Sequence, residues 1–269
     1  MILVCRRTAY LLTPRATAEK FDQNASGWNG QPGRPGYAHF RWMRRLVGCF
    51  ATAPSGGRIL DFGSGAGWCG IEAALRAPTP HLAAFDPSPA MVRIAADNAA
   101  AEGITGFEGR VGFGEDPPFP GPGEEPYDLV ISSGVVSFAR DIEAWMAGLA
   151  RTVRPGGTLV IGDLNPASRG MRGRRRSRPL LPIRELNAHT SGEVRAWLEE
   201  RGFRHEETAG YQLTYPVPQA MHFSDTRLGG ALSRPILWAN AGLTALDRTL
   251  NGRLVDQFDS WVMRFAAPS

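Results

Sequence analysis

The sequence predicts an α/β fold built on a doubly wound, mostly parallel sheet of seven strands. Short apolar runs alternate with helical patterns along the chain, as expected for parallel strands joined by helices. In addition, the glycine-rich turn Gly63–Gly67 follows one apolar run directly and precedes a helix. In sheets of this class such a turn lies at the edge where ligands bind.

The apolar runs place the strands. The expected strands are Arg58–Phe62, His81–Phe85, Gly106–Val111, Tyr127–Ser132, Thr158–Asp163, Phe203–Thr208 and Trp261–Phe265. The fourth run, YDLVIS, is almost continuously hydrophobic, which predicts a strand that is buried on both faces.

Helical patterns fill most of the intervals. The expected helices cover about Gly67–Arg76, the segment after Ser88, Asp141–Val153 and Ser191–Arg201. Ser88 is the expected N-cap of its helix, whose apolar positions form one stripe. Asn165–His189 shows no clear element, and Pro216–Asn251 is expected to be a Pro-broken loop followed by an amphipathic helix.

The composition is that of a globular chain, with 43% hydrophobic and 21% charged residues among 269. No apolar run is long enough for a bilayer span or a signal peptide. Cys5, Cys49 and Cys69 form no disulfide or zinc pattern, so we expect a reducing, cytoplasmic location and no metal site.

The net charge of +4 comes almost wholly from arginine, because Lys20 is the only lysine. Six arginines fall within Arg169–Arg178. Such a run can contact RNA phosphates or an acidic substrate. No aromatic residues interleave with it to stack bases, which favours a solvated loop and makes nucleic acid an unexpected partner.

The strongest functional signal is Asp61-Phe62-Gly63-Ser64-Gly65-Ala66-Gly67. Its glycines allow a tight turn and a close approach of the backbone to a ligand. The helix that follows presents free N–H groups and its positive dipole end, which suit a carboxylate. Asp61 can receive a positively charged amino group. The alternative is a tight strand–helix turn that binds nothing.

A second acid, Asp86, ends the second expected strand, 23 residues after Gly63. An acid there can accept hydrogen bonds from both hydroxyls of a ribose, or it only starts the turn Asp86–Pro89. A dinucleotide fingerprint, GxGxxG, would need glycine where this chain has Trp68. An NAD oxidoreductase is therefore disfavoured.

Together these motifs resemble the class I S-adenosylmethionine (SAM)-dependent methyltransferases, which have a Rossmann-like fold. The glycine turn is similar to the family's motif I, and Asp86 stands where the family keeps its ribose-binding acid. Tyr127–Val130 with Ser132–Gly134 resembles the family's fourth strand and the loop on its cofactor side.

The resemblance extends to both sides of these motifs. Arg154–Leu159, RPGGTL, resembles the entry to the family's fifth strand. Upstream, Phe21–Trp28 resembles a segment that folds over the cofactor in many small-molecule members. The similarity spans about Phe21 to Phe203.

Two departures from the family pattern affect the expected site. Phe113 replaces an Asp that often meets the adenine amino group, so adenine is expected to be held by backbone and packing, or by Glu115 or Asp116. Many relatives have a His after strand four, where this chain has Val136-Ser137-Phe138, so that residue's role is absent here.

The resemblance implies SAM as cofactor and a set of residues that bind it. These are Phe21, Trp28, Asp61, Gly63, Ser64, Gly65, Gly67, Asp86, Pro87, Met91, Phe113, Gly114, Glu115, Ser132 and Ser133.

We expect one domain over residues 1–269, because no linker or repeat interrupts it. Residues 1–50 form an N-terminal helical lid and 58–163 the cofactor-binding core. The insertions after strands five and six, 164–189 and 216–257, form the acceptor side. In the tail, Trp238 and Trp261 are expected in the core or covering the acceptor pocket rather than anchoring a membrane.

Methyl transfer needs an acceptor lone pair in line with the methyl group, and a base where the acceptor carries a proton. His39 is the first candidate base, with Tyr37 beside it. Further candidates are His189, His205, His222 and Asp163. Transfer by proximity alone requires none of them.

We therefore expect direct in-line methyl transfer from SAM to a small organic acceptor. Apolar residues of the insertions favour a hydrophobic or aromatic one: Phe223, Leu228, Leu232 and Trp238. Two alternatives stay open: an RNA or protein methyltransferase that uses Arg169–Arg178, and a non-catalytic SAM-binding scaffold. The sequence selects neither the acceptor atom nor an oligomeric state.

Overall fold

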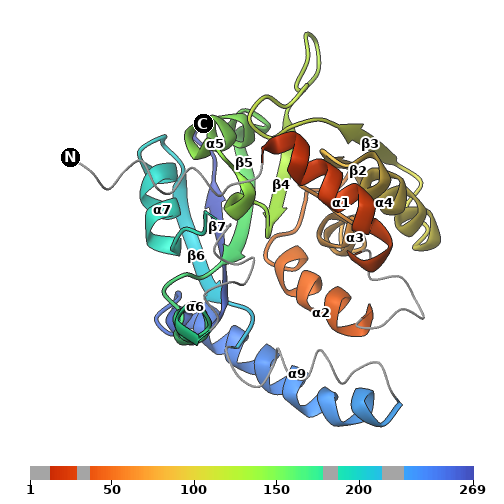
Figure 1. The fold of residues 1–269 in the computed structure, drawn as a ribbon. Helices are drawn as coiled ribbons and strands as arrows, with labels where there is room; N and C mark the ends of the chain where they lie inside the picture. Colours follow the sequence, from red (N-terminus) through yellow and green to blue (C-terminus); the bar gives the residue numbers. More distant parts are fainter. Residues whose placement is uncertain (1–12, 29–36, 178–186, 214–226) are drawn as a thin grey trace.

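The computed structural model describes residues 13–28, 37–177, 187–213 and 227–269. Its seven strands form a sheet in the order β3-β2-β1-β4-β5-β7-β6 (Figure 1). They are β1 (Arg58–Phe62), β2 (His81–Asp86), β3 (Phe107–Val111), β4 (Tyr127–Ser133), β5 (Val153–Leu164), β6 (Arg204–Gly210) and β7 (Ser260–Ala266). The first five are parallel, whereas β7 runs antiparallel to both β5 and β6. The predicted Rossmann-like, mostly parallel seven-stranded sheet is confirmed.

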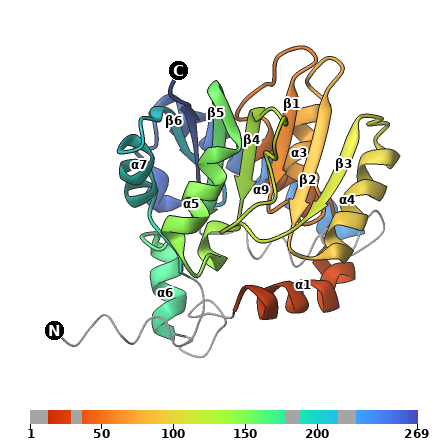
Figure 2. The ribbon, with the colours of Figure 1, turned by 90° about the horizontal axis from the view of Figure 1, so that it is seen from above.

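Helices cover both faces of this sheet. They are α1 (Pro14–Trp28), α2 (Tyr37–Gly48), α3 (Trp68–Ala74), α4 (Pro89–Ala101), α5 (Ile142–Arg151), α6 (Arg169–Ser177), α7 (Ser191–Glu199) and α9 (Arg227–Thr249), with the 3-10 helices η2 (Val136–Phe138) and η4 (Val255–Gln257). The helices α5 and α7 lie on one face, and α2, α3 and α9 lie on the other (Figures 1 and 2). In the described part of the chain, no helix is both long and apolar enough to cross a bilayer.

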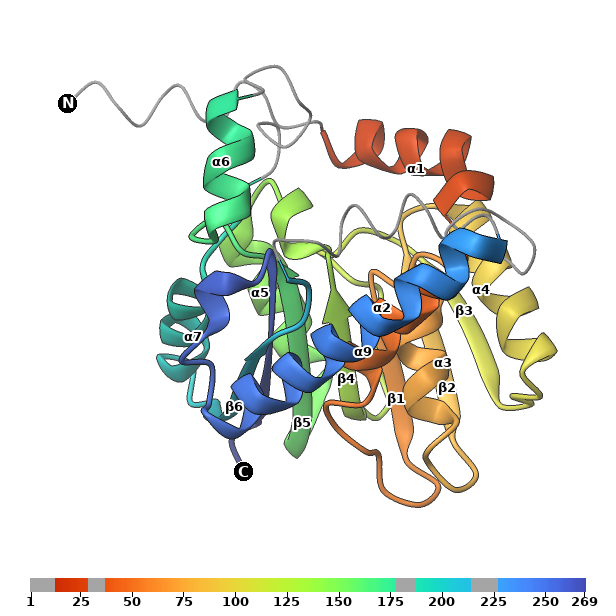
Figure 3. The same ribbon diagram turned by 90° about the horizontal axis from the view of Figure 1, so that it is seen from below.

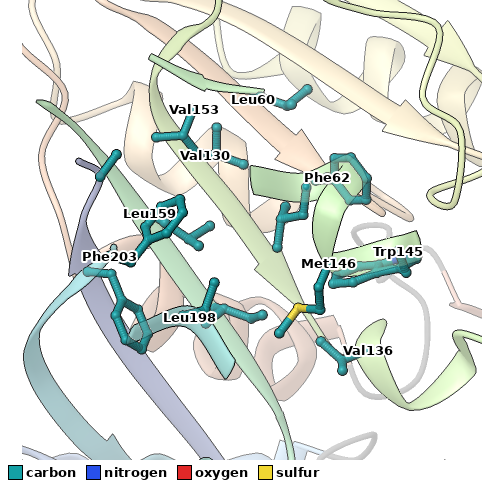
Figure 4. Close-up of a cluster of buried hydrophobic side chains, with 14 of the residues drawn as sticks. Leu60, Phe62, Val130, Val136, Trp145, Met146, Val153, Leu159, Leu198 and Phe203 are labelled. Carbon is teal, nitrogen blue, oxygen red and sulfur yellow. The ribbon is translucent and has the colours of Figure 1, made fainter. Parts of the chain in front are cut away.

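The period of two along the central strands builds both hydrophobic cores. In β1, Ile59 packs with the α2 and α3 side, and the next residue, Leu60, packs with the α5 and α7 side. Figure 4 shows the second core, where Met146 of α5 and Leu198 of α7 meet strand residues such as Leu159. Because both faces are covered, the strands read as continuous apolar runs.

Caps fix the starts of several helices. The side chain of Ser88 accepts a hydrogen bond from Met91 N at 3.1 Å, as the sequence predicts. Thr190 and Glu193 form a reciprocal capping box at the start of α7.

The prediction that Asn165–His189 holds no element is wrong in its first half, because Arg169–Ser177 forms α6. Ser168 caps this helix: its Oγ accepts from Met171 N at 3.0 Å and donates to Asp259 at 2.8 Å. Met171 is buried and anchors the helix. The arginines at positions 169, 172, 174, 175 and 176 therefore belong to a helix that projects from the sheet, and not to a loop (Figures 2 and 3).

The prediction for the tail tryptophans is only half right. Trp261 of β7 is fully buried, whereas Trp238 of α9 is 71% exposed and lines no part of the cavity described below. Polar residues of α9 face the protein instead. Asn240 accepts from Leu213 N at 2.8 Å, and Asp247 accepts from Gly210 N at 2.8 Å and Leu254 N at 2.6 Å.

Replacing Asp247 with Ala tests this attachment of α9. The change leaves two buried backbone N–H groups without acceptors, so we expect the free energy of unfolding to fall by about 3 kcal/mol. Urea denaturation measures the loss. Asp97→Ala, at an exposed position of α4, is the matched control and is expected to leave stability unchanged. Equal stability of the two variants would contradict this role.

Candidate active site

A cavity opens at the carboxyl ends of β1, β2 and β4. Strand order reverses between β1 and β4, and sheets of this kind bind ligands at such a switch point. The cavity is lined by most of the residues that the sequence predicts to bind the cofactor: Phe21, Asp61, Gly63, Ser64, Gly65, Asp86, Pro87, Met91, Phe113, Gly114, Glu115 and Ser133.

The glycines of the turn after β1 serve different purposes. Gly63 has φ +75°, and a Cβ there would lie 2.5 Å from Val135 Cγ2, so only glycine allows the two loops to meet. Gly65 has φ +50°, and a Cβ there would meet no described atom within 4 Å. Since Gly65 lines the cavity, that open space is available to a ligand.

Asp61 is buried at the end of β1, where its Oδ2 accepts a hydrogen bond from Gly70 N at 2.8 Å. Burial raises the pKa of this carboxyl to about 7, although the Gly70 N–H and the Arg44 guanidinium oppose the shift. A nearby cation would stabilise the ionised form. The site thus favours a ligand with a positively charged group beside Asp61.

Asp86 joins the ends of two strands. Its Oδ2 accepts from Gly65 N at 2.9 Å, and its Oδ1 accepts from Ser88 N at 2.9 Å. Burial raises its pKa to about 6. Asp86 is therefore a turn residue and also a wall of the cavity, where each carboxyl oxygen keeps acceptor capacity.

Helix α1 is attached to the core over this cavity. Asp22 Oδ1 accepts from Ser88 Oγ at 2.7 Å and from Ala90 N at 2.9 Å, which joins α1 to the start of α4. The ring of Phe21 meets Phe138 of η2 edge-on, with centroids 5.2 Å apart. Thr17 and Phe21 contribute the α1 side of the lining.

Aromatic residues and backbone form another side of the cavity. Phe113 and Trp145 line it, and Trp145 meets Phe62 edge-on at 5.3 Å. Glu115 also lines it, whereas the side chain of Asp116 is 97% exposed and faces Arg151. Of the two acids considered for adenine, Glu115 lines the cavity and Asp116 does not.

Several lining residues were not predicted: Thr17, Arg44, Trp68, Cys69, Phe138 and Trp145. Trp68 and Cys69 follow the glycine turn directly, so their position was a usable signal. Arg44 belongs to no recognisable sequence motif. Its guanidinium donates to Ser133 Oγ at 2.9 Å. Burial, with the Asp61 carboxylate, raises the pKa of the Cys69 thiol to about 12, which keeps the thiol neutral.

Two predicted cofactor residues do not line the cavity. Ser132 is buried and donates from Oγ to Phe62 O at 2.8 Å, so it joins β4 to β1. Gly67 is the N-cap residue of α3, where a Cβ would lie 2.9 Å from Ala95 Cβ. Both residues support the site from within the protein: Ser132 links β4 to β1, and Gly67 allows the turn to pack closely against Ala95 of α4.

The candidate bases fare differently. The side chains of the candidate bases Tyr37 and His39 and the whole of His222 lie outside the described residues, as does the side chain of Trp28, which the sequence predicts to bind the cofactor. His189, His205 and Asp163 are described but do not line the cavity. Asp163 accepts from Ser137 N at 2.7 Å and Ser137 Oγ at 3.1 Å, so it holds η2 in place.

The described walls fit SAM. Ser64 Oγ is buried and has no hydrogen-bond partner among the described residues. Asp61 suits an amino group, Asp86 suits a ribose, and the rings of Phe113 and Trp145 suit a flat purine. The open space at Gly65 leaves room for the ligand between these groups.

The model of a protein family described as "Methyltransferase domain" matches residues 37–208, which is more than half of the chain. The chain belongs to this family. It is a class I SAM-dependent methyltransferase, and SAM is its cofactor.

Similar sequences carry the same kind of activity in their names. An arsenite methyltransferase of Halobacterium salinarum is 30% identical over 60% of this chain and 40% of its own length. A demethylmenaquinone methyltransferase of Thermus thermophilus is 34% identical over 51% of this chain and 60% of its own length. This methyltransferase thus spans about half the length of these relatives.

The fold is shared with solved structures. The magnesium protoporphyrin IX methyltransferase from Synechocystis with bound S-adenosylhomocysteine (SAH) has a TM-score of 0.61 at 15% identity. The alignment covers 96% of this chain and 100% of that one.

Replacing Gly65 with Ala tests where the methyltransferase binds its cofactor. The new Cβ would enter the open space, so we expect affinity for SAH to fall at least about tenfold, with backbone strain of about 1–2 kcal/mol. Titration calorimetry measures the affinity. Gly103→Ala is the matched control, because Gly103 also has positive φ and no described atom near its Cβ but lies away from the cavity. Equal SAH affinity in the two variants would place the ligand elsewhere.

Proposed function

We propose that this methyltransferase transfers the methyl group of SAM to a small, hydrophobic or aromatic organic acceptor. The observation that carries the proposal is a largely apolar cavity with carboxylates at one wall, bounded by Phe21, Phe138 and Val135. Bound SAM supplies an electrophilic methyl group. The relative named for demethylmenaquinone supports an acceptor with an apolar ring.

In this proposal Asp61 holds the amino group of SAM and Asp86 holds the two ribose hydroxyls. Phe113, Glu115 and Trp145 enclose the adenine, and Met91 and Pro87 complete that wall. Ser64 and the backbone of the glycine turn receive the remaining polar groups, and Arg44 with its partner Ser133 lines the cavity near Asp61. These roles use the positions of the side chains in the cavity.

The described residues support transfer by positioning rather than by a strong base. The carboxyls of Asp61 and Asp86 belong to the proposed cofactor contacts, and Cys69 is neutral. Phe21 and Phe138 give this part of the cavity an apolar lining. Binding an acceptor there in line with the methyl group lowers the barrier through proximity. Tyr37 and His39 stay predictions for acceptors that lose a proton.

The raised pKa values predict how cofactor binding depends on pH. Below the pKa of Asp61, about 7, its carboxyl is neutral and pairs poorly with an amino group; Asp86 loses its charge below about 6. We expect affinity for SAH to rise from below pH 6 to above pH 7 and then level off, by up to about tenfold per pH unit.

Asp61→Asn separates the contributions of the two acids. Asn keeps an oxygen for Gly70 N but cannot ionise, so affinity above pH 7 is expected to fall and the pH dependence to weaken. Calorimetry across this range measures both. A wild-type affinity that does not change with pH would show that Asp61 does not hold the amino group.

An acceptor assay with α6 altered tests the proposed function. Arg174→Gln, Arg175→Gln and Arg176→Gln, made together, remove three cations of α6. If the acceptor is a small aromatic molecule that does not need these cations, the triple variant keeps turnover within about twofold, since substitutions away from a functional contact usually cost within about 0.5 kcal/mol.

The assay follows label from methyl-labelled SAM into a panel of phenols, hydroquinones and tRNA. Transfer to tRNA that falls steeply with salt and is lost in the triple variant would overturn the small-molecule proposal. Binding of SAH without transfer to any acceptor would favour the scaffold alternative.

A further inference from the structure

The outer face of α9 is apolar, although it faces solvent. Trp238 is 71% exposed, Leu246 47% and Leu243 39%. The other residues of this face are also exposed and uncharged: Pro235, Ala239, Gly242, Ala245 and Thr249. We call these eight residues the α9 stripe. A surface helix ordinarily presents charged residues at such positions.

The inner face of α9 is the polar one. Asn240, Thr244 and Asp247 are buried toward β6, beside the buried Leu237 and the partly buried Ile236. The apolar side chains of Trp238, Leu243 and Leu246 thus face the solvent. Figure 3 shows α9 as the outermost layer on its side of the sheet, with α2 behind it. No described helix or strand covers the stripe.

Exposed arginines stand at both ends of the α9 stripe. Asp247 is the only acid in α9, and it is fully buried. Arg234 is exposed at the beginning of the stripe, and Arg253 is exposed just after the helix. A surface of Trp and Leu bordered by Arg complements the apolar–anionic boundary of a phospholipid layer.

The size of the α9 stripe argues against a second copy as its occupant. Stable protein interfaces use about 20–30 residues on each side, whereas the stripe has eight on one helix. Partial insertion of a few apolar side chains among headgroups needs no such area.

We propose that the α9 stripe binds an anionic phospholipid surface and holds the methyltransferase on it without spanning it. This proposal rests on the proposed function in one respect only: an apolar acceptor would concentrate in the same lipid layer, beside the bound methyltransferase. Lipid binding itself is measured without SAM or acceptor, so it stands or fails separately from methyl transfer.

Co-sedimentation with vesicles tests the proposal on the full chain. The vesicles are an equal mixture of phosphatidylglycerol and phosphatidylcholine, with phosphatidylcholine alone for comparison. We expect binding to the anionic vesicles that weakens with salt. Trp238→Ser with Leu246→Ser is expected to reduce the partition coefficient at least about tenfold. Thermal denaturation of this variant is expected to match the wild type.

Matched controls distinguish vesicle binding through the α9 stripe from nonspecific hydrophobic or electrostatic adsorption. Leu75→Ser with Val111→Ser alters two side chains of similar exposure, 47% and 48%, elsewhere on the surface and is expected to leave binding unchanged. The α6 triple variant is expected to retain most of its binding.

Four results would overturn the proposal. The first is a wild-type chain that stays in the supernatant, and the second is an equal loss of vesicle binding in the Leu75/Val111 control. The third is vesicle binding that depends only on the arginines of α6. The fourth is a Trp238/Leu246 variant that melts at a lower temperature, or that is monomeric in light scattering where the wild type is a dimer. The last would show that the chain itself or a second copy covers the α9 stripe.

Discussion

The geometry of the cavity depends on how closely the loop after β1 approaches the loop after β4. At Gly63 a side chain would collide with Val135, and the backbone there and at Ser64 donates two hydrogen bonds to Phe85 O at 2.8 and 2.9 Å. These contacts draw the carboxyl ends of three strands together. Asp61 and Asp86 then face the same space, although 25 positions separate them in the sequence numbering.

This convergence has an electrostatic cost. Both carboxyls lose solvent, and their pKa values rise to about 7 and 6. Asp61 therefore holds its proton more tightly in the folded chain than in the unfolded one. Its contribution to stability is present below the ordinary pKa of 3.8 and is lost as pH rises through about 7. A cation beside Asp61 offsets that loss, so a ligand with a positively charged group would stabilise the folded chain above pH 7.

Much of this could be predicted from the sequence, because local chemistry determines it. Alternating or continuous apolar residues place the strands, Ser88 marks a helix start, and the glycines mark the turn. Arg44 could not be predicted, since its role depends on where α2 packs against β4. Helix α6 was missed because arginines dominate its sequence, and neither the buried Met171 nor the capping Ser168 forms a recognisable helical pattern. The exposure of Trp238 was missed for a related reason: the sequence pattern indicates an apolar stripe on the helix but not whether that stripe faces the core or the solvent.

That direction follows from the polar side of α9. Turning the helix to bury Trp238 and Leu246 would carry Asp247 away from Gly210 N and Leu254 N, and Asn240 away from Leu213 N. Each of these buried groups would lose its partner, at about 1–3 kcal/mol apiece. Burying a Trp and a Leu recovers about 1.5–3 kcal/mol per side chain, so the three lost hydrogen bonds offset the gain. The polar anchors hold the helix in its present rotation, and its apolar side chains stay on the outside.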